Sequence, residues 1–182
     1  MSDQNLASQY PKSIKLADGA DVEIRLMSAE DRDAILAFAQ ALPQEDLLFL
    51  RVDLTQPEVV DAWVNNLEAG TSTLLVVYDE SGLIGYATVH TNPAPWTRRV
   101  GELRVNVNQA YRTRGLSKNL ISEIFDVARG LGMKKLMANM TTDQHGAQAA
   151  FRKLGFVPEA LLADYVEDRN GTSINLVIMS YD

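Results

Sequence analysis

The sequence contains no cysteine. This absence excludes disulfide bonds, thiolate metal sites and a cysteine nucleophile, so thiol chemistry would have to come from a cofactor. No apolar run approaches the roughly 20 residues that cross a bilayer. The N-terminus also lacks the basic start and apolar run of a secretory signal. These absences predict a soluble cytoplasmic protein with no membrane partner.

Positive charge is also scarce, with 17 Lys and Arg against 24 Asp and Glu and a formal net charge of −7. This balance argues against general nucleic-acid binding, which needs a basic face, and it suits a cationic or amine-bearing substrate. A hydrophobic content of 46% and a charged content of 23% are typical of a folded globular chain. We expect a single domain over residues 1–182, with residues 1–12 as a flexible tail.

Apolar patterning predicts a mixed α/β chain. Strand patterns occupy residues 21–27, 74–78, 83–90, 101–107 and 135–140, and two more strands follow Gly155 and are joined by an Asn-Gly turn. Helical spacing follows Ser28 and Pro57, runs from Leu116 to a glycine pair at 130 and 132, and recurs at residues 146–154. The order predicts a mixed sheet flanked by helices.

The segment "YRTRGLSKNL", residues 111–120, places three cations around one glycine in an acidic chain. No acidic residue occurs from Leu103 to Ser122. A strand ends before this segment and a helix begins inside it, and the first N–H groups of a helix favour an anion. Gly115 allows close approach of the backbone, and Ser117 is small. The segment is predicted to be a pyrophosphate cradle, and the alternative is a solvated surface turn.

The spacing of Arg112, Gly115 and Ser117 matches neither a Walker loop nor a dinucleotide fingerprint. It matches the pattern Gln/Arg-x-x-Gly-x-Gly/Ala. The strand "GELRVNV" and then "NQAYR" precede it, and residues 132–136 and "AAFRKLGFVPEA" follow it in order. On these motifs the sequence resembles the GNAT superfamily of acyl-CoA-dependent N-acetyltransferases, over residues 22–179.

The resemblance implies a GNAT-like, mostly antiparallel central sheet of about seven strands, with a splay between the fourth and fifth strands, residues 102–107 and 135–140. It also implies acetyl-CoA as cosubstrate and no metal. The pantetheine arm is expected to lie in the splay like an added strand, and the diphosphate at the helix start. The implied cofactor-binding residues are Val105, Asn106, Val107, Arg112, Thr113, Arg114, Gly115, Leu116, Ser117, Lys118, Gln144 and Phe151.

The resemblance also suggests catalytic residues. Glu102 precedes Arg112 by ten positions, which is similar to the placement of a glutamate base in the protein-acetylating branch of the family. The alternative role for Glu102 is a structural partner for Arg104 or Arg99. Family members often have a tyrosine as general acid where this chain has Phe151. Tyr165 is the candidate replacement, and the alternatives are that it is an ordinary strand aromatic and that water supplies the proton.

Some other residues are candidates of lower priority. His90 and His145 are too isolated in sequence to suggest a metal site. Trp96, in the proline-containing loop 91–99, would cover either the amine pocket or the core. The apolar C-terminal strand "INLVIM" would support a homodimer if it lies at a sheet edge.

The predicted function is transfer of an acetyl group from acetyl-CoA to a primary amine, on a small molecule or a peptide, by direct attack in a ternary complex. The alternatives are a non-catalytic acyl-CoA-binding or regulatory domain and, more remotely, a phosphate-binding interaction domain without CoA. The sequence does not name the acceptor, because one scaffold serves many acceptors.

Overall fold

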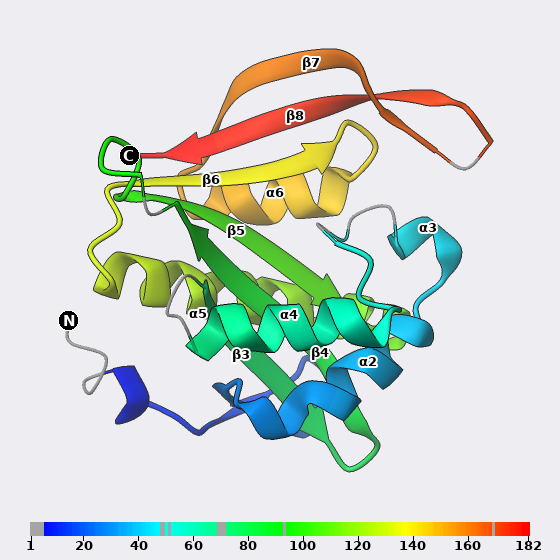
Figure 1. Ribbon diagram of the computed structural model, residues 1–182, viewed down its shortest axis with the longest axis vertical. Coiled ribbons are helices and arrows are strands. Elements are labelled where there is room, and N and C mark those ends of the chain that lie inside the picture. Colours follow the sequence, from blue (N-terminus) through cyan, green and yellow to red (C-terminus); the bar gives the residue numbers. More distant parts are fainter. Residues whose placement is uncertain (1–5, 48–49, 51, 69–71, 93, 169) are drawn as a thin grey trace.

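A computed structural model describes residues 6–47, 50, 52–68, 72–92, 94–168 and 170–182. Its centre is one open sheet of eight strands in the order β1-β2-β3-β4-β5-β6-β8-β7 (Figure 1). The strands are β1 (Lys12–Lys15), β2 (Asp21–Leu26), β3 (Ser72–Asp79), β4 (Gly82–Thr91), β5 (Val100–Val107), β6 (Lys135–Thr141), β7 (Val157–Glu167) and β8 (Ser173–Tyr181). All neighbours pair antiparallel except β5 and β6, which pair parallel.

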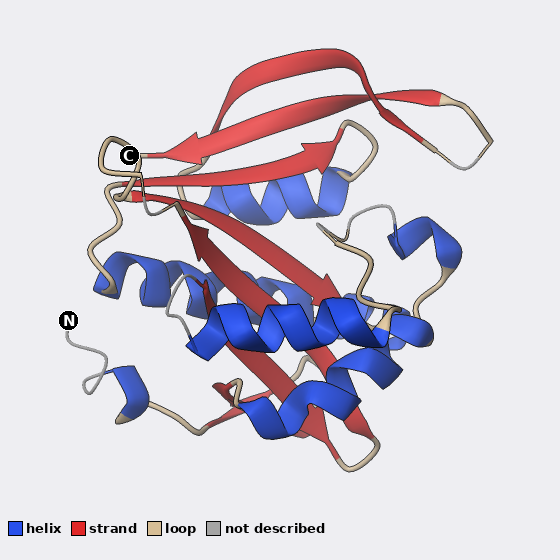
Figure 2. Ribbon diagram, viewed as in Figure 1, coloured by secondary structure: helices blue, strands red, loops and turns tan. Residues whose placement is uncertain are grey.

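Helices cover both faces of the sheet (Figure 2). The described helical segments are η1 (Ala29–Asp31), α2 (Arg32–Gln40), α3 (Gln44–Leu47), α4 (Pro57–Glu68), η2 (Gln109–Arg114), α5 (Leu116–Gly130) and α6 (His145–Lys153). Helices α2 and α4 pack on one face of the sheet and α5 and α6 pack on the other, giving two hydrophobic clusters. The predicted mixed, mostly antiparallel fold is confirmed.

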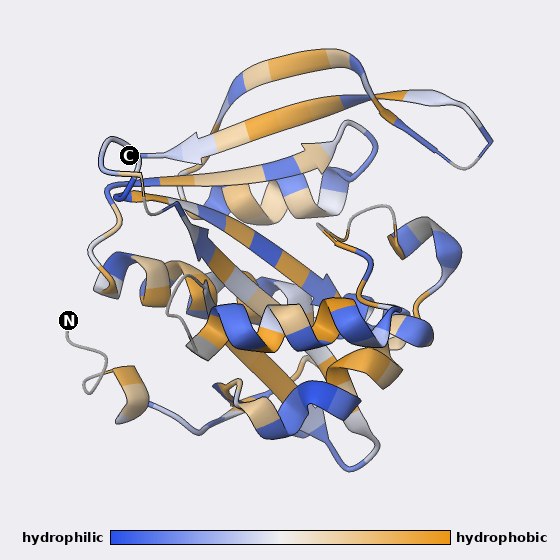
Figure 3. Cartoon of the chain, viewed as in Figure 1, coloured by the Kyte–Doolittle hydropathy of each residue, from blue (hydrophilic) through white to orange (hydrophobic). Residues whose placement is uncertain are grey.

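Strand β3 lies between these clusters. Leu75 and Val77 face the α5 side, and Leu74 and Val76 face the α4 side, each at most 1% exposed. A strand buried on both faces has no polar alternation, which is why "LLVV" is continuous. On β5, by contrast, hydrophobic and hydrophilic residues alternate (Figure 3), with Leu103 and Val107 buried on the α5 side.

Strands β5 and β6 separate after a short paired stretch. They pair only from Val100 opposite Lys135 to Glu102 opposite Met137. Beyond that point β5 stays paired with β4 to Val107, and β6 stays paired with β8 to Thr141. The last five residues of β5 therefore form no ladder with β6, and the predicted splay between these strands is confirmed.

The structure differs from the sequence prediction at both ends of the chain. Within the segment 1–12, for which the sequence predicts a flexible tail, Leu6 is 5% exposed in the core, and β1, which starts at Lys12, adds an eighth strand. At the other end, β8 lies between β6 and β7, so "INLVIM" is not at the sheet edge on which the predicted homodimer depended. Among the described residues, no helix has the length and apolarity to span a membrane.

Asp31 fixes the entry into α2. Its side chain is 2% exposed and accepts hydrogen bonds from Arg25, from the main-chain N–H of Ser28 at 2.8 Å and from the Tyr78 hydroxyl at 2.7 Å. Burial alone would raise the pKa of Asp31, but these hydrogen bonds outweigh it and lower the pKa below its ordinary value. Burial, together with the bond to Asp31, raises the pKa of Tyr78 to about 12.

We predict that Asp31→Asn lowers the free energy of unfolding by about 3 kcal/mol at pH 7, because Arg25 then lacks its buried partner. The folded-state pKa of Asp31 is depressed, so its stabilisation is complete above about pH 4 and is lost as the pH falls through the folded-state value. Urea unfolding between pH 2 and 7 measures this, with the exposed Asp33→Asn as control. A wild-type advantage that stays constant down to pH 2 would contradict the assignment.

Candidate active site

The corner that opens α5 lies where β5 ends. Asn108 caps η2 by accepting from the N–H of Ala110 at 3.0 Å, and Gly115 then turns the chain into α5 with φ +84°. This conformation favours glycine. A Cβ on Gly115 would have only the Ala17 Cβ within 4.0 Å, so the corner is not packed closed at this point. Leu116, Ser117 and Lys118 form the first turn, whose N–H groups have no acceptor within the helix.

The two arginines of this corner contact carboxylates of the same chain. Arg112 donates to Asp46 at 2.5 Å and to the Val107 carbonyl at 3.2 Å, and Arg114 donates to Asp18 at 2.5 Å. These bonds tie the corner to α3 and to the β1–β2 turn. The bond from Arg114 lowers the pKa of Asp18. Lys118 and Thr113 are exposed. Both arginines of the predicted cradle therefore lie at this corner, but in this structure each binds a carboxylate of the same chain.

Main-chain groups of β5 face the gap between β5 and β6. The Asn106 carbonyl points toward β4, because a Cβ on Gly85 would lie 3.0 Å from it. Successive residues of a strand direct their N–H and C=O groups to opposite edges. Val105 and Val107 therefore direct theirs away from β4, toward the gap. The Val107 carbonyl accepts from Arg112, and the main-chain groups of Val105 and the Val107 N–H also lie on this edge, beyond the stretch that pairs with β6.

The end of β6 contributes polar groups to the other wall. Gln144 reaches back from α6, and its side-chain oxygen accepts from the Thr141 N–H at 3.1 Å. Gln148, which is buried, donates to the carbonyls of Thr141 and Thr142. The Thr141 hydroxyl is fully buried and has no hydrogen-bond partner among the described residues.

Glu102 occupies the last paired position before the strands separate. Its Oε1 accepts from Arg104 Nε at 3.0 Å and NH2 at 2.6 Å, and from Asn139 Nδ2 of β6 at 3.4 Å. Of the two structural partners suggested by the sequence, the structure shows a bond from Arg104. Because both donors flank the start of the gap, the Glu102 carboxylate lies between β5 and β6, on the face opposite to α5.

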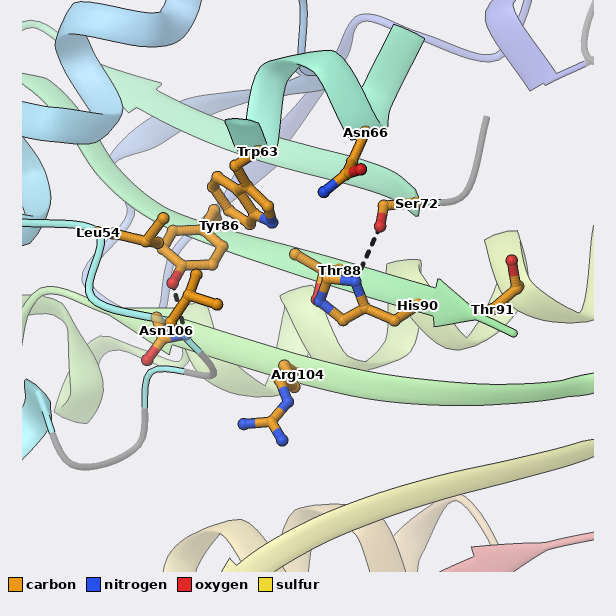
Figure 4. Close-up of a pocket in the computed structure, with 11 residues that line it drawn as sticks. Leu54, Trp63, Asn66, Ser72, Tyr86, Thr88, His90, Thr91, Arg104 and Asn106 are labelled. Carbon is orange, nitrogen blue, oxygen red and sulfur yellow. Dashed lines mark hydrogen bonds between the residues drawn. The ribbon is translucent and has the colours of Figure 1, made fainter. Parts of the chain in front are cut away.

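A pocket of about 190 Å³ lies on the α4 side of β4 and β5, and Arg104, the partner of Glu102, is one of the residues that line it (Figure 4). Its apolar end holds Trp63 and Tyr86, whose rings meet edge to face at 5.4 Å. Asn106 donates to the Tyr86 hydroxyl at 2.9 Å, and burial raises the pKa of Tyr86. Tyr86 is thus a fixed neutral wall of the pocket.

The polar side of the pocket is ordered around His90. Ser72 Oγ lies 2.9 Å from its Nδ1 and Thr88 Oγ1 lies 2.9 Å from its Nε2 (Figure 4). Both ring nitrogens therefore have hydroxyl partners, which fix the ring plane. His90 also stands directly across from Glu102 in the β4–β5 register, so it belongs to the wall of the same site.

The structure does not bring the other predicted residues into this site. Tyr165 is 65% exposed on β7, which is separated from β5 by β6 and β8, a lateral distance of about 14 Å at 4.8 Å per strand. Phe151 is 5% exposed and packs edge to face on Phe156 at 5.0 Å, as part of the core. Trp96 is 88% exposed, and His145 is exposed at the start of α6.

Sequence reasoning missed several residues of this region. Asp46 lies far from the motif in sequence, and only the folded chain brings it to Arg112. Trp63 lies far from β5 in sequence, and only the folded chain places it in the same pocket as Arg104. Tyr86 and Thr88 alternate on β4 with buried aliphatic residues, and that period-2 pattern could have assigned them to the face opposite to Ala87 and Val89. Among the residues that the structure describes, His, Asp and Glu form no group of three suited to a metal ion.

Comparison with known proteins identifies the protein family to which the chain belongs. The model of the acetyltransferase (GNAT) family matches residues 39–156, more than half of the chain. The curated "Putative phosphinothricin acetyltransferase YwnH" of Bacillus subtilis (strain 168) is 24% identical over 148 residues, which cover 79% of this chain and 89% of that protein.

Solved structures share the fold. An N-acetyltransferase from Staphylococcus aureus Mu50 has a TM-score of 0.78 at 18% identity, covering 90% of this chain and 99% of the other. A GNAT superfamily phosphinothricin acetyltransferase from Sinorhizobium meliloti, solved in complex with AcCoA, has a TM-score of 0.74 at 21% identity, covering 88% and 87%. The fold is that of an acyltransferase, and the chain belongs to the GNAT family of acetyltransferases.

We predict that Thr141→Val raises the free energy of unfolding of the ligand-free protein by about 1 kcal/mol, because it replaces an unsatisfied buried hydroxyl with a methyl group of similar shape. Thr88→Val is the matched control. It removes the hydroxyl that contacts His90 and should lower stability by about 1 kcal/mol. Urea unfolding measures both, and equal losses in the two variants would mean that the Thr141 hydroxyl has a partner.

Proposed function

We propose that the protein transfers the acetyl group of acetyl-CoA to the primary amine of a small molecule. The observation that carries this proposal is the gap between β5 and β6. The N-terminus of α5 lies near the end of β5, and the Glu102 carboxylate lies where the two strands begin to separate. The family match and the AcCoA-bound state of the Sinorhizobium meliloti neighbour support the choice of cosubstrate.

The main-chain amides from Gly115 to Lys118 would hold the diphosphate, since helix starts bind anions through unpartnered N–H groups. Lys118 adds a charge on the first turn. Arg112 and Arg114 would either remain bonded to Asp46 and Asp18 and hold these amides in position, or release the two carboxylates and bond to the diphosphate when it binds. Thr113 is exposed in η2, just before this turn, and would lie near the nucleotide end of the cofactor.

The pantetheine arm would lie along the gap as an added strand. The Val105 N–H and C=O and the Val107 N–H supply main-chain partners on β5, while Asn106 faces the acceptor side. At the end of β6 the Gln144 amide would contribute to the opposite wall. Phe151 packs beneath this wall as part of the core. Bound acetyl-CoA supplies an activated acyl thioester.

Transfer would proceed by direct attack, because the chain has no cysteine that could form a covalent acyl intermediate. Glu102 would accept the proton of the amine directly or through a water molecule. The Val105 N–H faces the gap and would stabilise negative charge on the thioester oxygen. Water would protonate the leaving thiolate, since Phe151 has no hydroxyl and Tyr165 lies on the far strand β7.

We predict that CoA raises the melting temperature of the protein, with a gain of about 2.7 kcal/mol at 100 times Kd. Ser117→Glu with Lys118→Glu should abolish this gain. Acidic residues suit the first turn of a helix, so the unliganded variant should stay folded. Lys134→Glu, a charge reversal beyond the other end of α5, is the control and should keep the shift. A normal shift in the double variant would remove the helix start from the cofactor site.

Glu102→Gln should lower kcat by about 100-fold with little change in CoA affinity, because the amide cannot accept the proton while the bond from Arg104 is retained. Release of CoA thiol, followed from pH 6 to 9, measures the rate. The loss of rate should appear throughout this pH range. A variant that keeps the wild-type rate at every pH would assign Glu102 a structural role only.

A further inference from the structure

Arg114 immediately precedes Gly115, and contacts hold both its main chain and its side chain. Its carbonyl accepts the N–H of Ala17 at 2.9 Å, and its Nε donates to the Asp18 carboxylate at 2.5 Å. Its guanidinium also lies over the ring of Tyr111, with its central carbon 4.4 Å from the ring centroid. An aromatic face attracts a cation at this distance. Arg114 is therefore held from two sides, by the β1–β2 turn and by the Tyr111 ring.

The β1–β2 turn is a firm support for Arg114. The Asp18 carboxylate accepts the N–H of Ala20 at 3.2 Å as well as the bond from Arg114, so its direction is fixed. Leu16, at the start of the turn, is 3% exposed in the core, and its N–H donates to the Ala20 carbonyl at 2.8 Å. Because moving the turn away from α5 would expose Leu16 to water, the turn stays against the corner.

Tyr111 is attached to a second turn. Its hydroxyl donates to Asp79 at the end of β3, so the ring that faces Arg114 is tied to the β3–β4 turn. Partial burial would raise the pKa of Asp79, but hydrogen bonds from Ser81 and Tyr111 and the charge of Arg114 outweigh it and lower the pKa. Asp79 is therefore ionised at neutral pH and remains a strong acceptor for Tyr111.

The bond from Ala17 sets the direction of the first amide of the corner. The Arg114 carbonyl and the Gly115 N–H belong to one planar trans peptide unit, in which they point in opposite directions. Because the carbonyl is held against the β1–β2 turn, the Gly115 N–H points away from that turn. Gly115 then adopts φ +84° and leads into α5. Rotation of this single peptide would redirect an N–H of the proposed diphosphate site.

We propose that Asp18 and Arg114 are positioning residues for acetyl-CoA, which hold the peptide before Gly115 in place while main-chain amides bind the diphosphate. This inference rests on the cofactor site proposed above. Of the two courses open to Arg114 when the diphosphate binds, the contacts favour the one in which it remains bonded to Asp18 and stacked on Tyr111. A turn outside the sequence motif thus contributes to the cofactor site.

The two courses predict opposite effects of one substitution. Asp18→Asn should raise the Kd of CoA by about 3- to 5-fold, a factor that matches the contribution of a partly exposed ion pair. If Arg114 instead left Asp18 to bind the diphosphate, removal of the acid would lower the Kd. Isothermal titration calorimetry measures the change. Asp21→Asn, which removes an exposed partner of Lys15 on the same hairpin, is the matched control and should leave the Kd unchanged.

A fragment of the cofactor separates support of the diphosphate site from an effect on the fold. Adenosine 3′-phosphate 5′-diphosphate carries the diphosphate but not the pantetheine arm, and Asp18→Asn should weaken its binding by the same factor as CoA. Asp18→Glu, which keeps a carboxylate, should recover part of the affinity. A Kd for CoA or for the fragment that is unchanged or lower in Asp18→Asn would overturn the positioning role.

A double-mutant cycle tests whether Arg114 itself contacts the diphosphate. Arg114→Gln should raise the Kd of CoA by about 3- to 5-fold in the wild type but by less than about 2-fold when Asp18 is already Asn, because the support is then already lost. An equal loss in both backgrounds would assign Arg114 to direct contact and overturn the inference while leaving the cofactor site in place. Absence of CoA binding by the wild type would overturn the proposed function, and this inference with it.

Discussion

The separation of β5 from β6 is the constraint on which the rest of the structure depends. A parallel pair normally continues as long as both strands do, because each unpaired main-chain group costs free energy when it is buried. Here three residue pairs form and then each strand keeps only its other neighbour, β4 or β8. The edge of β5 is left with main-chain groups that face a gap. A ligand that pairs like a strand would satisfy these groups.

Ion pairs with two aspartates explain why an acidic chain has a basic turn, residues 112–118, beside the end of β5. Arg114 binds Asp18 of the β1–β2 turn, and Arg112 binds Asp46 of α3. Soon after α3 the chain reaches Leu54, which lines the pocket on the other face of the sheet. Arg112 thus contacts the Val107 carbonyl at the end of β5 and Asp46 of α3. It therefore links the end of β5 to the helix that precedes the pocket-lining Leu54 in sequence.

The sequence predicted the elements that depend on local pattern. The α5 stripe, the continuous apolar run of β3 and the glycine at the start of α5 each follow from periodicity or backbone conformation, and the structure confirms them. Sequence patterning could not predict β1, because it is a four-residue strand with only polar–apolar alternation. It also could not predict the ion pair between Arg112 and Asp46, because 66 residues separate them. Likewise, the charge of the pocket depends on which side chains of β4 and β5 share a face of the sheet, and the overall composition does not predict this arrangement. The roles of Glu102 and the cradle residues stay predictions.

The most direct measurement is a crystal structure of the protein with CoA bound. The account predicts diphosphate oxygens within about 3 Å of the main-chain nitrogens of residues 115–118 and a pantetheine arm between β5 and β6 that bonds with Val105. A diphosphate bound away from the start of α5, or a pantetheine arm outside the gap, would contradict it.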